Sequence, residues 1–117
     1  MNVTKFFVLV QFVLAVVGCA TTPIEKKSLT VTIESNGDHE DCLQIRANQQ
    51  ITLRFTSSKP TDFNIHAHFG EDVMYAVQKE AITTYEDSVT LAKAGQYCLM
   101  WTNLVAEPVT LTYQYSL

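Results

Sequence analysis

The chain has 117 residues, of which 47% are hydrophobic, and its formal net charge at pH 7 is −4. This length suits one small domain and leaves no room for a second. The acidic balance argues against a nucleic-acid partner, which would need a basic stripe, and against electrostatic docking on anionic lipid headgroups.

The first segment is an apolar run that ends in a cysteine. The run covers residues 6–17, is too short to span a bilayer, and is followed by small residues, as in a cleavable export signal. The residues Val16-Val17-Gly18-Cys19-Ala20 resemble the lipobox of bacterial lipoproteins. This resemblance implies that residues 1–18 are a removable signal helix and that Cys19 carries the lipid, including palmitate. The alternative is an ordinary signal peptide that leaves Cys19 as a spare thiol.

The lipoprotein resemblance also implies a location in the bacterial cell envelope. Acyl chains on Cys19 would anchor the chain to a membrane, since two or more chains make a stable anchor. Ala20 favours the outer membrane, facing the periplasm, by the sorting rule of enteric bacteria. On this interpretation residues 19–28 are the lipidated cysteine and a polar tether, and residues 29–117 are the folded domain.

Two further cysteines, Cys42 and Cys98, then lie in a compartment that permits disulfides. A bond between them would close a loop of about 55 residues and stabilise the fold by about 3–4 kcal/mol. The alternatives are two buried free thiols, or Cys98 as a soft metal ligand.

Beyond the tether, apolar and polar residues alternate with period two, and the segments are rich in Val, Ile, Thr, Tyr and Phe. The strand that contains residues 51–55 is expected to stop at Ser57-Ser58-Lys59-Pro60, because proline cannot donate to a ladder. A further strand is expected to begin near Cys42. The pattern predicts an all-β chain that forms a single antiparallel β-sandwich of about seven or eight strands. The strands are predicted at residues 29–33, 51–55, 63–69, 73–77, 82–91, 97–101 and 109–115, besides the one near Cys42.

The C-terminal third carries a longer motif. The residues Gly95-Gln96-Tyr97-Cys98-Leu99-Met100-Trp101-Thr102-Asn103 follow the pattern Gly-x-Tyr-x-Leu-x-Trp-x-Asn and resemble the closing hairpin of GOLD (Golgi dynamics) domains. The likeness covers residues 50–115. It implies a jelly-roll β-sandwich that works as an interaction module without catalysis. Trp101 is interpreted as a core residue and Asn103 as a turn residue.

One group of side chains could bind a metal ion. His66 and His68 are two residues apart on a predicted strand, so both imidazoles leave the same face and can converge on one ion. A three-residue turn at Gly70-Glu71-Asp72 would place Met74 opposite His68, and Met100 could be a fourth ligand from a neighbouring strand. Imidazole with thioether suits copper, or zinc, better than magnesium or calcium. The alternative is that both histidines are solvated and that Met74 covers apolar surface.

Catalytic motifs are not found. The chain lacks a Gly-x-Ser-x-Gly elbow, a phosphate-binding glycine loop and a His-Glu-x-x-His helix. His39 falls in an acidic stretch that is expected to be a solvated loop, and the pairs Glu71-Asp72 and Glu86-Asp87 point to opposite strand faces. The sequence therefore predicts no enzyme.

The leading prediction is a lipid-anchored envelope lipoprotein that acts as a non-catalytic binding module with a protein or small-ligand partner. An exposed aromatic cluster drawn from Tyr75, Tyr85, Tyr113 or Tyr115 would support protein or lipid contact, since tyrosine is enriched where one end stays wet. The alternative is a periplasmic copper- or zinc-binding protein that uses the histidine pair with methionine.

Overall fold

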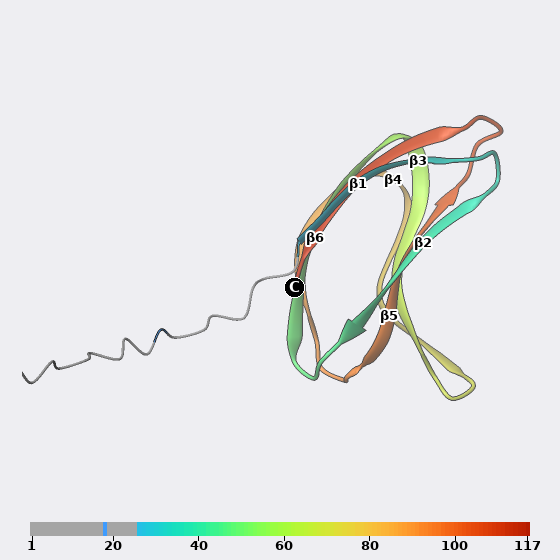
Figure 1. The fold of residues 1–117 in the computed structure, drawn as a ribbon. Coiled ribbons are helices and arrows are strands. Elements are labelled where there is room, and N and C mark those ends of the chain that lie inside the picture. Colours follow the sequence, from blue (N-terminus) through green and yellow to red (C-terminus); the bar gives the residue numbers. More distant parts are fainter. Residues whose placement is uncertain (1–17, 19–25) are drawn as a thin grey trace, which may run out of the picture.

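The computed structural model describes Gly18 and residues 26–117, and every regular element in this part of the chain is a β-strand (Figure 1). The all-β prediction is therefore confirmed for these residues. Across residues 26–117 there is no helix long and apolar enough to cross a membrane. The predicted signal helix and Cys19 lie outside the described residues. The strands are β1 (Lys26–Ile33), β2 (Asp38–Ile45), β3 (Gln49–Phe69), β4 (Asp72–Leu91), β5 (Gly95–Asn103) and β6 (Val109–Ser116).

The six strands form one antiparallel sheet in the order β1-β6-β3-β5-β2, and β4 pairs with β3. Residues 52–57 of β3 pair with β6, whereas residues 61–67 pair with β5. The sheet is thereby curled into two halves that face each other (Figure 1). The β6 half contains β1, β6, the start of β3 and the end of β4. The β5 half contains β2, β5, the end of β3 and the start of β4.

The strand expected to stop at Pro60 continues, so that prediction was wrong. The register of β3 against β4 shifts between Thr56 and Thr61, and Pro60 lies inside this shift. Proline is tolerated there because β3 is leaving β6 and joining β5, so no ladder N–H is required of it. Two strands are long enough to take part in both halves, which is why six strands replace the predicted seven or eight. β2 also begins earlier than predicted, at Asp38.

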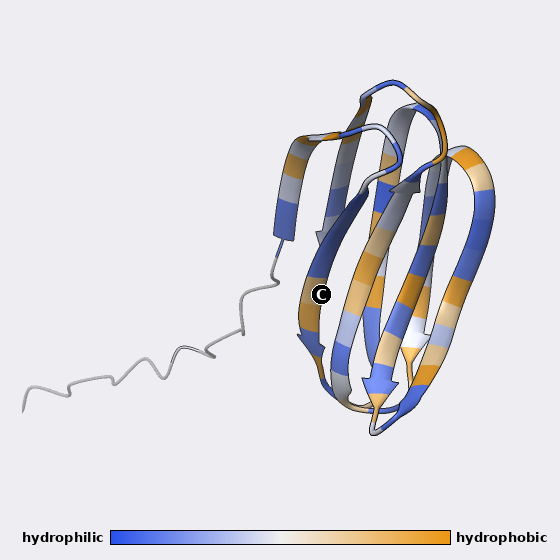
Figure 2. Cartoon of the chain, turned by 90° about the vertical axis from the view of Figure 1, so that its right-hand side faces the viewer, coloured by the Kyte–Doolittle hydropathy of each residue, from blue (hydrophilic) through white to orange (hydrophobic). Residues whose placement is uncertain are grey.

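The core lies between the two halves, and apolar and polar residues alternate along the strands that surround it (Figure 2). Phe55 of the β6 half contacts Phe63 and Trp101 of the β5 half, with ring centroids 4.9 and 5.6 Å apart. Trp101 is fully buried, as predicted. Aromatic packing thus joins the two halves, and each such pair adds about 0.5–1.5 kcal/mol beyond its buried area.

Two further contacts fasten the strands. Cys42 and Cys98 are directly opposite each other on β2 and β5 and form a disulfide, as the cysteine count predicted. Asn103 is the buried last residue of β5 rather than part of a turn, and its side chain bonds to backbone groups at the end of β1 and in the turn between β5 and β6. All six strands and the disulfide fall within residues 26–117, so a chain that starts at residue 20 retains every contact described here.

Candidate binding sites

The β3–β4 hairpin extends beyond the rest of the sheet (Figure 1). Its turn is Gly70-Glu71, where Gly70 has a φ of 63°, a conformation that glycine adopts without a Cβ clash. Three consecutive apolar residues of its second arm are exposed, namely Val73 (44%), Met74 (39%) and Tyr75 (51%). Among the described residues, Leu104 is the one other exposed large apolar side chain. Val73 and Tyr75 lie on one face of this arm and Met74 on the other, so the hairpin exposes apolar side chains on both of its faces.

The two-residue turn contradicts the predicted register of this hairpin. His68 is opposite Val73, and Ala67 is opposite Met74. Directly opposed residues share a face, and neighbours along a strand alternate between faces. Met74 therefore lies on the other face from His68, and its predicted place beside the histidines was wrong.

A bulge explains how this register coexists with an intact core face. Ile65 is opposite Val77, while His66 is opposite Tyr75, which leaves Ala76 as the extra residue. Without a bulge, a two-residue turn would split the apolar face of the hairpin. The bulge removes that conflict, since it restores the expected pairing below it.

The structure does bring the two histidines together. The ring centroids of His66 and His68 are 5.2 Å apart, in an edge-to-face arrangement. His66 is buried, and its Nδ1 lies 2.7 Å from Oδ1 of Asn64, so Nδ1 donates and Nε2 is the ring nitrogen left to face a metal ion. Met100 is opposite Asn64 across the β3–β5 pair and shares this face. Of the four predicted metal ligands, the fold gathers three on one face and excludes Met74.

A polar network that the sequence interpretation missed lies between β2 and the β6 half. The hydroxyl of Tyr113 donates to Oδ2 of Asp41 at 2.6 Å, and Nε2 of His39 lies 3.1 Å from that hydroxyl. Nζ of Lys27 lies 2.8 Å from the same carboxylate oxygen. Burial lowers the pKa of His39, a shift that the negative charge of Asp41 opposes. Burial also raises the pKa of Tyr113, as does its bond to Asp41.

This network corrects the prediction of a solvated loop around His39. The segment is strand β2, and His39, Asp41, Leu43 and Ile45 point to its inner side. The period-two spacing of these four residues was the available signal, and the acidic residues Asp38, Glu40 and Asp41 obscured it. Because the network joins β2 to β1 and β6, we assign it a structural role in closing the curled sheet.

The four tyrosines that could have supported partner contact do not form an exposed cluster. Tyr113 and Tyr115 are buried on the inner side of β6, and Tyr85 is half-buried with its ring stacked on Phe55. Only Tyr75 of the four is strongly exposed.

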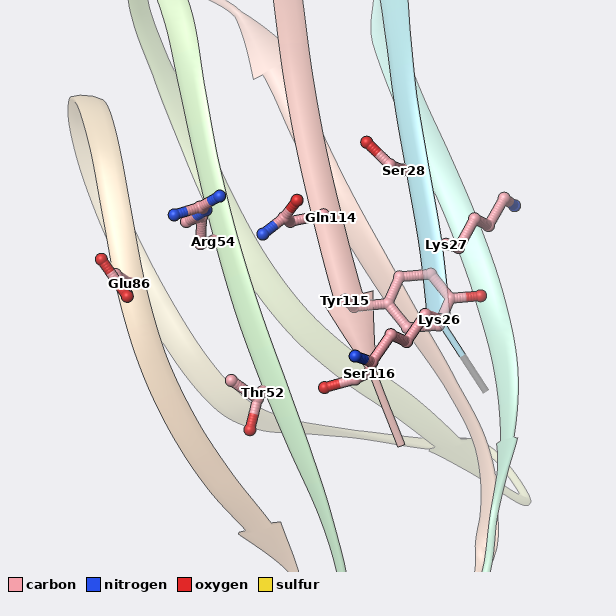
Figure 3. A pocket seen from close by; sticks show the side chains of 9 residues that line it. All are labelled: Lys26, Lys27, Ser28, Thr52, Arg54, Glu86, Gln114, Tyr115 and Ser116. Atoms are coloured by element: carbon pink, nitrogen blue, oxygen red, sulfur yellow. The ribbon is translucent and has the colours of Figure 1, made fainter. Parts of the chain in front are cut away.

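The outer face of the β6 half contains a recess of about 450 Å³ (Figure 3). Ser28, Gln114, Arg54 and Glu86 form one cross-strand row in it, contributed by β1, β6, β3 and β4 in turn. Lys26 lies at its edge. Four different strands supply these residues, so no local motif in the sequence predicts the recess.

No family model matches the chain, and no curated protein matches it. Solved structures are similar to this chain. The Yersinia pseudotuberculosis-derived mitogen YPM is 10% identical, with a TM-score of 0.57 over 80% of this chain and 86% of that one. PliG of Aeromonas hydrophila, a periplasmic lysozyme inhibitor of g-type lysozyme, is 20% identical, with a TM-score of 0.58 over 78% of this chain and 84% of that one. At these identities the likeness shows the fold alone. Neither structure is described as a GOLD domain or a lipoprotein, so those two resemblances stay predictions.

Proposed function

We propose that this chain is a non-catalytic binding module of the bacterial envelope, lipid-anchored through Cys19 to the outer membrane, and that its β3–β4 hairpin contacts a protein partner. The observation that carries the proposal is the run of exposed apolar residues from Val73 to Tyr75 on a projecting hairpin. Apolar side chains gathered in this way mark interaction sites more often than scattered ones do. The resemblance to GOLD domains supports the same class of function.

The partner class to test first is a lysozyme. One structural neighbour is described as a periplasmic inhibitor of g-type lysozyme, and a projecting hairpin suits insertion into the concave site of an enzyme. Tyr75 would be a main anchor, because tyrosine combines a large apolar ring with a polar end and is enriched at binding hot spots.

The test is inhibition of peptidoglycan lysis by a g-type lysozyme, with the chain from residue 20 as inhibitor. The triple variant Val73→Ser/Met74→Ser/Tyr75→Ser should lose inhibition by at least about tenfold, since losing one anchor typically costs more than about 1.4 kcal/mol. Leu104→Ser is the matched control, because Leu104 is as exposed but lies in the β5–β6 connection. Its inhibition should equal that of the unmodified chain.

Two results would refute this proposal in different ways. If the folded, unmodified chain fails to inhibit at hundredfold molar excess, a lysozyme of this type is not the partner. If the triple variant and Leu104→Ser both inhibit like the unmodified chain, the hairpin is not the contact surface.

The anchor is tested separately by expression of the full chain in a bacterium with labelled palmitate. The label should enter the unmodified chain, and the chain should sediment with outer membranes. Cys19→Ala should lose both the label and the sedimentation. If the Cys19→Ala variant still carried labelled palmitate, Cys19 would not be the lipidated residue.

A copper or zinc site is the second candidate function, favoured by the 5.2 Å separation of the His66 and His68 rings. Titration of the chain from residue 20 with Cu(I) and Zn(II) tests it. Binding should be lost in His66→Ala/His68→Ala and unchanged in Met74→Ala, because Met74 lies on the other face. Equal titration curves for the unmodified chain and the double-histidine variant would exclude the site.

A further inference from the structure

The recess on the β6 half presents charges of both signs that have no ion-pair partner. Arg54 and Lys26 are its cations, apart from Lys27, which is paired with Asp41. Glu86 is its carboxylate and is directly opposite Arg54 across the β3–β4 pair. None of Arg54, Lys26 and Glu86 forms an ion pair with another described residue. A ligand can therefore meet both signs of charge.

Arg54 is held in a fixed orientation for such a ligand. With its side-chain oxygen turned toward the guanidinium, Gln114 accepts hydrogen bonds from Nε and Nη2 of Arg54 at 2.9 and 2.8 Å. The remaining guanidinium N–H groups stay available, and a planar guanidinium matches phosphate oxygens better than an ammonium does. The hydroxyl of Ser28 adds a further hydrogen-bonding group to the recess, whereas that of Thr52 is bonded to Ser88 (Figure 3).

The position of the recess along the chain indicates what would reach it. Lys26 is the first residue of β1 and lines the recess, and the predicted anchor Cys19 is seven residues earlier. Fully extended, that stretch spans at most about 25 Å. A lipidated Cys19 would therefore hold the recess within about 25 Å of the headgroups of its own membrane. Short tethers create effective concentrations of about a millimolar or more, so even a weak site would be occupied.

We propose that this recess binds the zwitterionic headgroup of a phospholipid with a primary amine, with the phosphate at Arg54 and Lys26 and the ammonium at Glu86. Two carbons separate phosphate from amine in such a headgroup, which suits directly opposed strand residues whose Cβ atoms are about 5 Å apart. The net charge of −4 would oppose docking on an anionic surface, but a zwitterion needs only local complementarity. This inference rests on the proposed anchoring, because the anchor is what brings the headgroup near.

The experiment is an NMR titration of the chain from residue 20 with glycerophosphoethanolamine, glycerophosphocholine and inorganic phosphate. This probe set needs no anchor and no lysozyme, so its outcome is independent of the tests of the proposed function. We expect saturable shifts at Arg54 and Gln114 with glycerophosphoethanolamine, with a Kd on the order of 1 mM. The choline analogue should bind more weakly, because its quaternary nitrogen cannot donate to Glu86.

Charge-matched variants complete the design. Arg54→Gln should weaken binding of glycerophosphoethanolamine at least about tenfold, as expected for a lost charged hydrogen bond of about 1.4 kcal/mol or more. Glu86→Gln should reduce it to the level of the choline analogue and leave phosphate binding intact. Lys79→Gln and Glu80→Gln are the controls, because they make the same charge changes on β4 outside the recess.

Two results would overturn the proposal of a headgroup site. Equal binding by the unmodified chain and Arg54→Gln would overturn it. Equal affinity for inorganic phosphate and for glycerophosphoethanolamine, with no effect of Glu86→Gln, would show a phosphate site and overturn the headgroup assignment.

Discussion

Asn103 lies at the end of the sheet where its side chain holds β1 to the β5–β6 turn. Replacing it by alanine tests how much these hydrogen bonds stabilise the fold. Its Nδ2 contacts the carbonyl oxygens of Ile33 at 3.1 Å, Glu34 at 3.1 Å and Glu107 at 2.7 Å. Its Oδ1 accepts from the backbone N–H of Val105 at 2.9 Å. One side chain thus connects the end of β1 to the turn between β5 and β6.

The expected cost follows from these contacts. Nδ2 carries two hydrogens, so its three acceptors share two donors, and about three effective hydrogen bonds are lost in Asn103→Ala. At about 0.5–1.5 kcal/mol each, the free energy of unfolding should fall by about 2–4 kcal/mol. For a domain of this size that is a large share of the total. Urea unfolding followed by tryptophan fluorescence measures it, since Trp101 is the single tryptophan.

Two more variants separate hydrogen bonding from packing. Asn103→Asp keeps the volume but turns a second oxygen toward the three carbonyls, so it should be at least as destabilising as alanine. Thr102→Ala, on the other face of β5, should cost less than about 0.5 kcal/mol. A loss below about 0.5 kcal/mol in Asn103→Ala would refute the role assigned to this side chain.

Three further variants test separate features of the fold. Because the Cys42–Cys98 bond spans 56 residues, Cys42→Ser/Cys98→Ser should lower the free energy of unfolding by about 4 kcal/mol, and an unchanged urea midpoint would contradict this. Burial lowers the pKa of His39 below its ordinary value of 6.5, so the unfolded state takes up its proton first. The contribution of neutral His39 to the free energy of unfolding should therefore be complete above pH 6.5 and decline as the pH falls toward the folded-state pKa of His39. In His39→Gln, the free energy of unfolding should fall less over this pH range than in the unmodified chain. In Gly95→Ala the new Cβ would lie 2.9 Å from the ring of Phe69, so the free energy of unfolding should fall by about 1–2 kcal/mol and the melting temperature should fall with it. An unchanged melting temperature would mean that the ring moves freely.

Several features of the fold followed from local pattern alone. Period-two alternation along the predicted strand at residues 63–69 puts Phe63, Ile65 and Ala67 on one face, and the structure buries all three. The disulfide followed from an even cysteine count together with the predicted export of the chain, without knowledge of the strand order. These inferences succeed because the alternation of side chains within a strand is a local property of extended backbone.

The candidate binding sites depended on which strands are neighbours and in what register, and local pattern does not encode either. The β3–β4 turn has two residues and not the predicted three, and this places Met74 on the face opposite the histidines, because a one-residue slip exchanges the faces of a strand. Bending β3 across a register shift at Pro60 let it pair with both β6 and β5. The sequence by itself thus determined which residues of the β3 segment 63–67 share the buried face, and it favoured the cysteine pair. Tertiary structure alone decided the inward network of His39 and the recess around Arg54, because each takes residues from strands that only the folded sheet brings together.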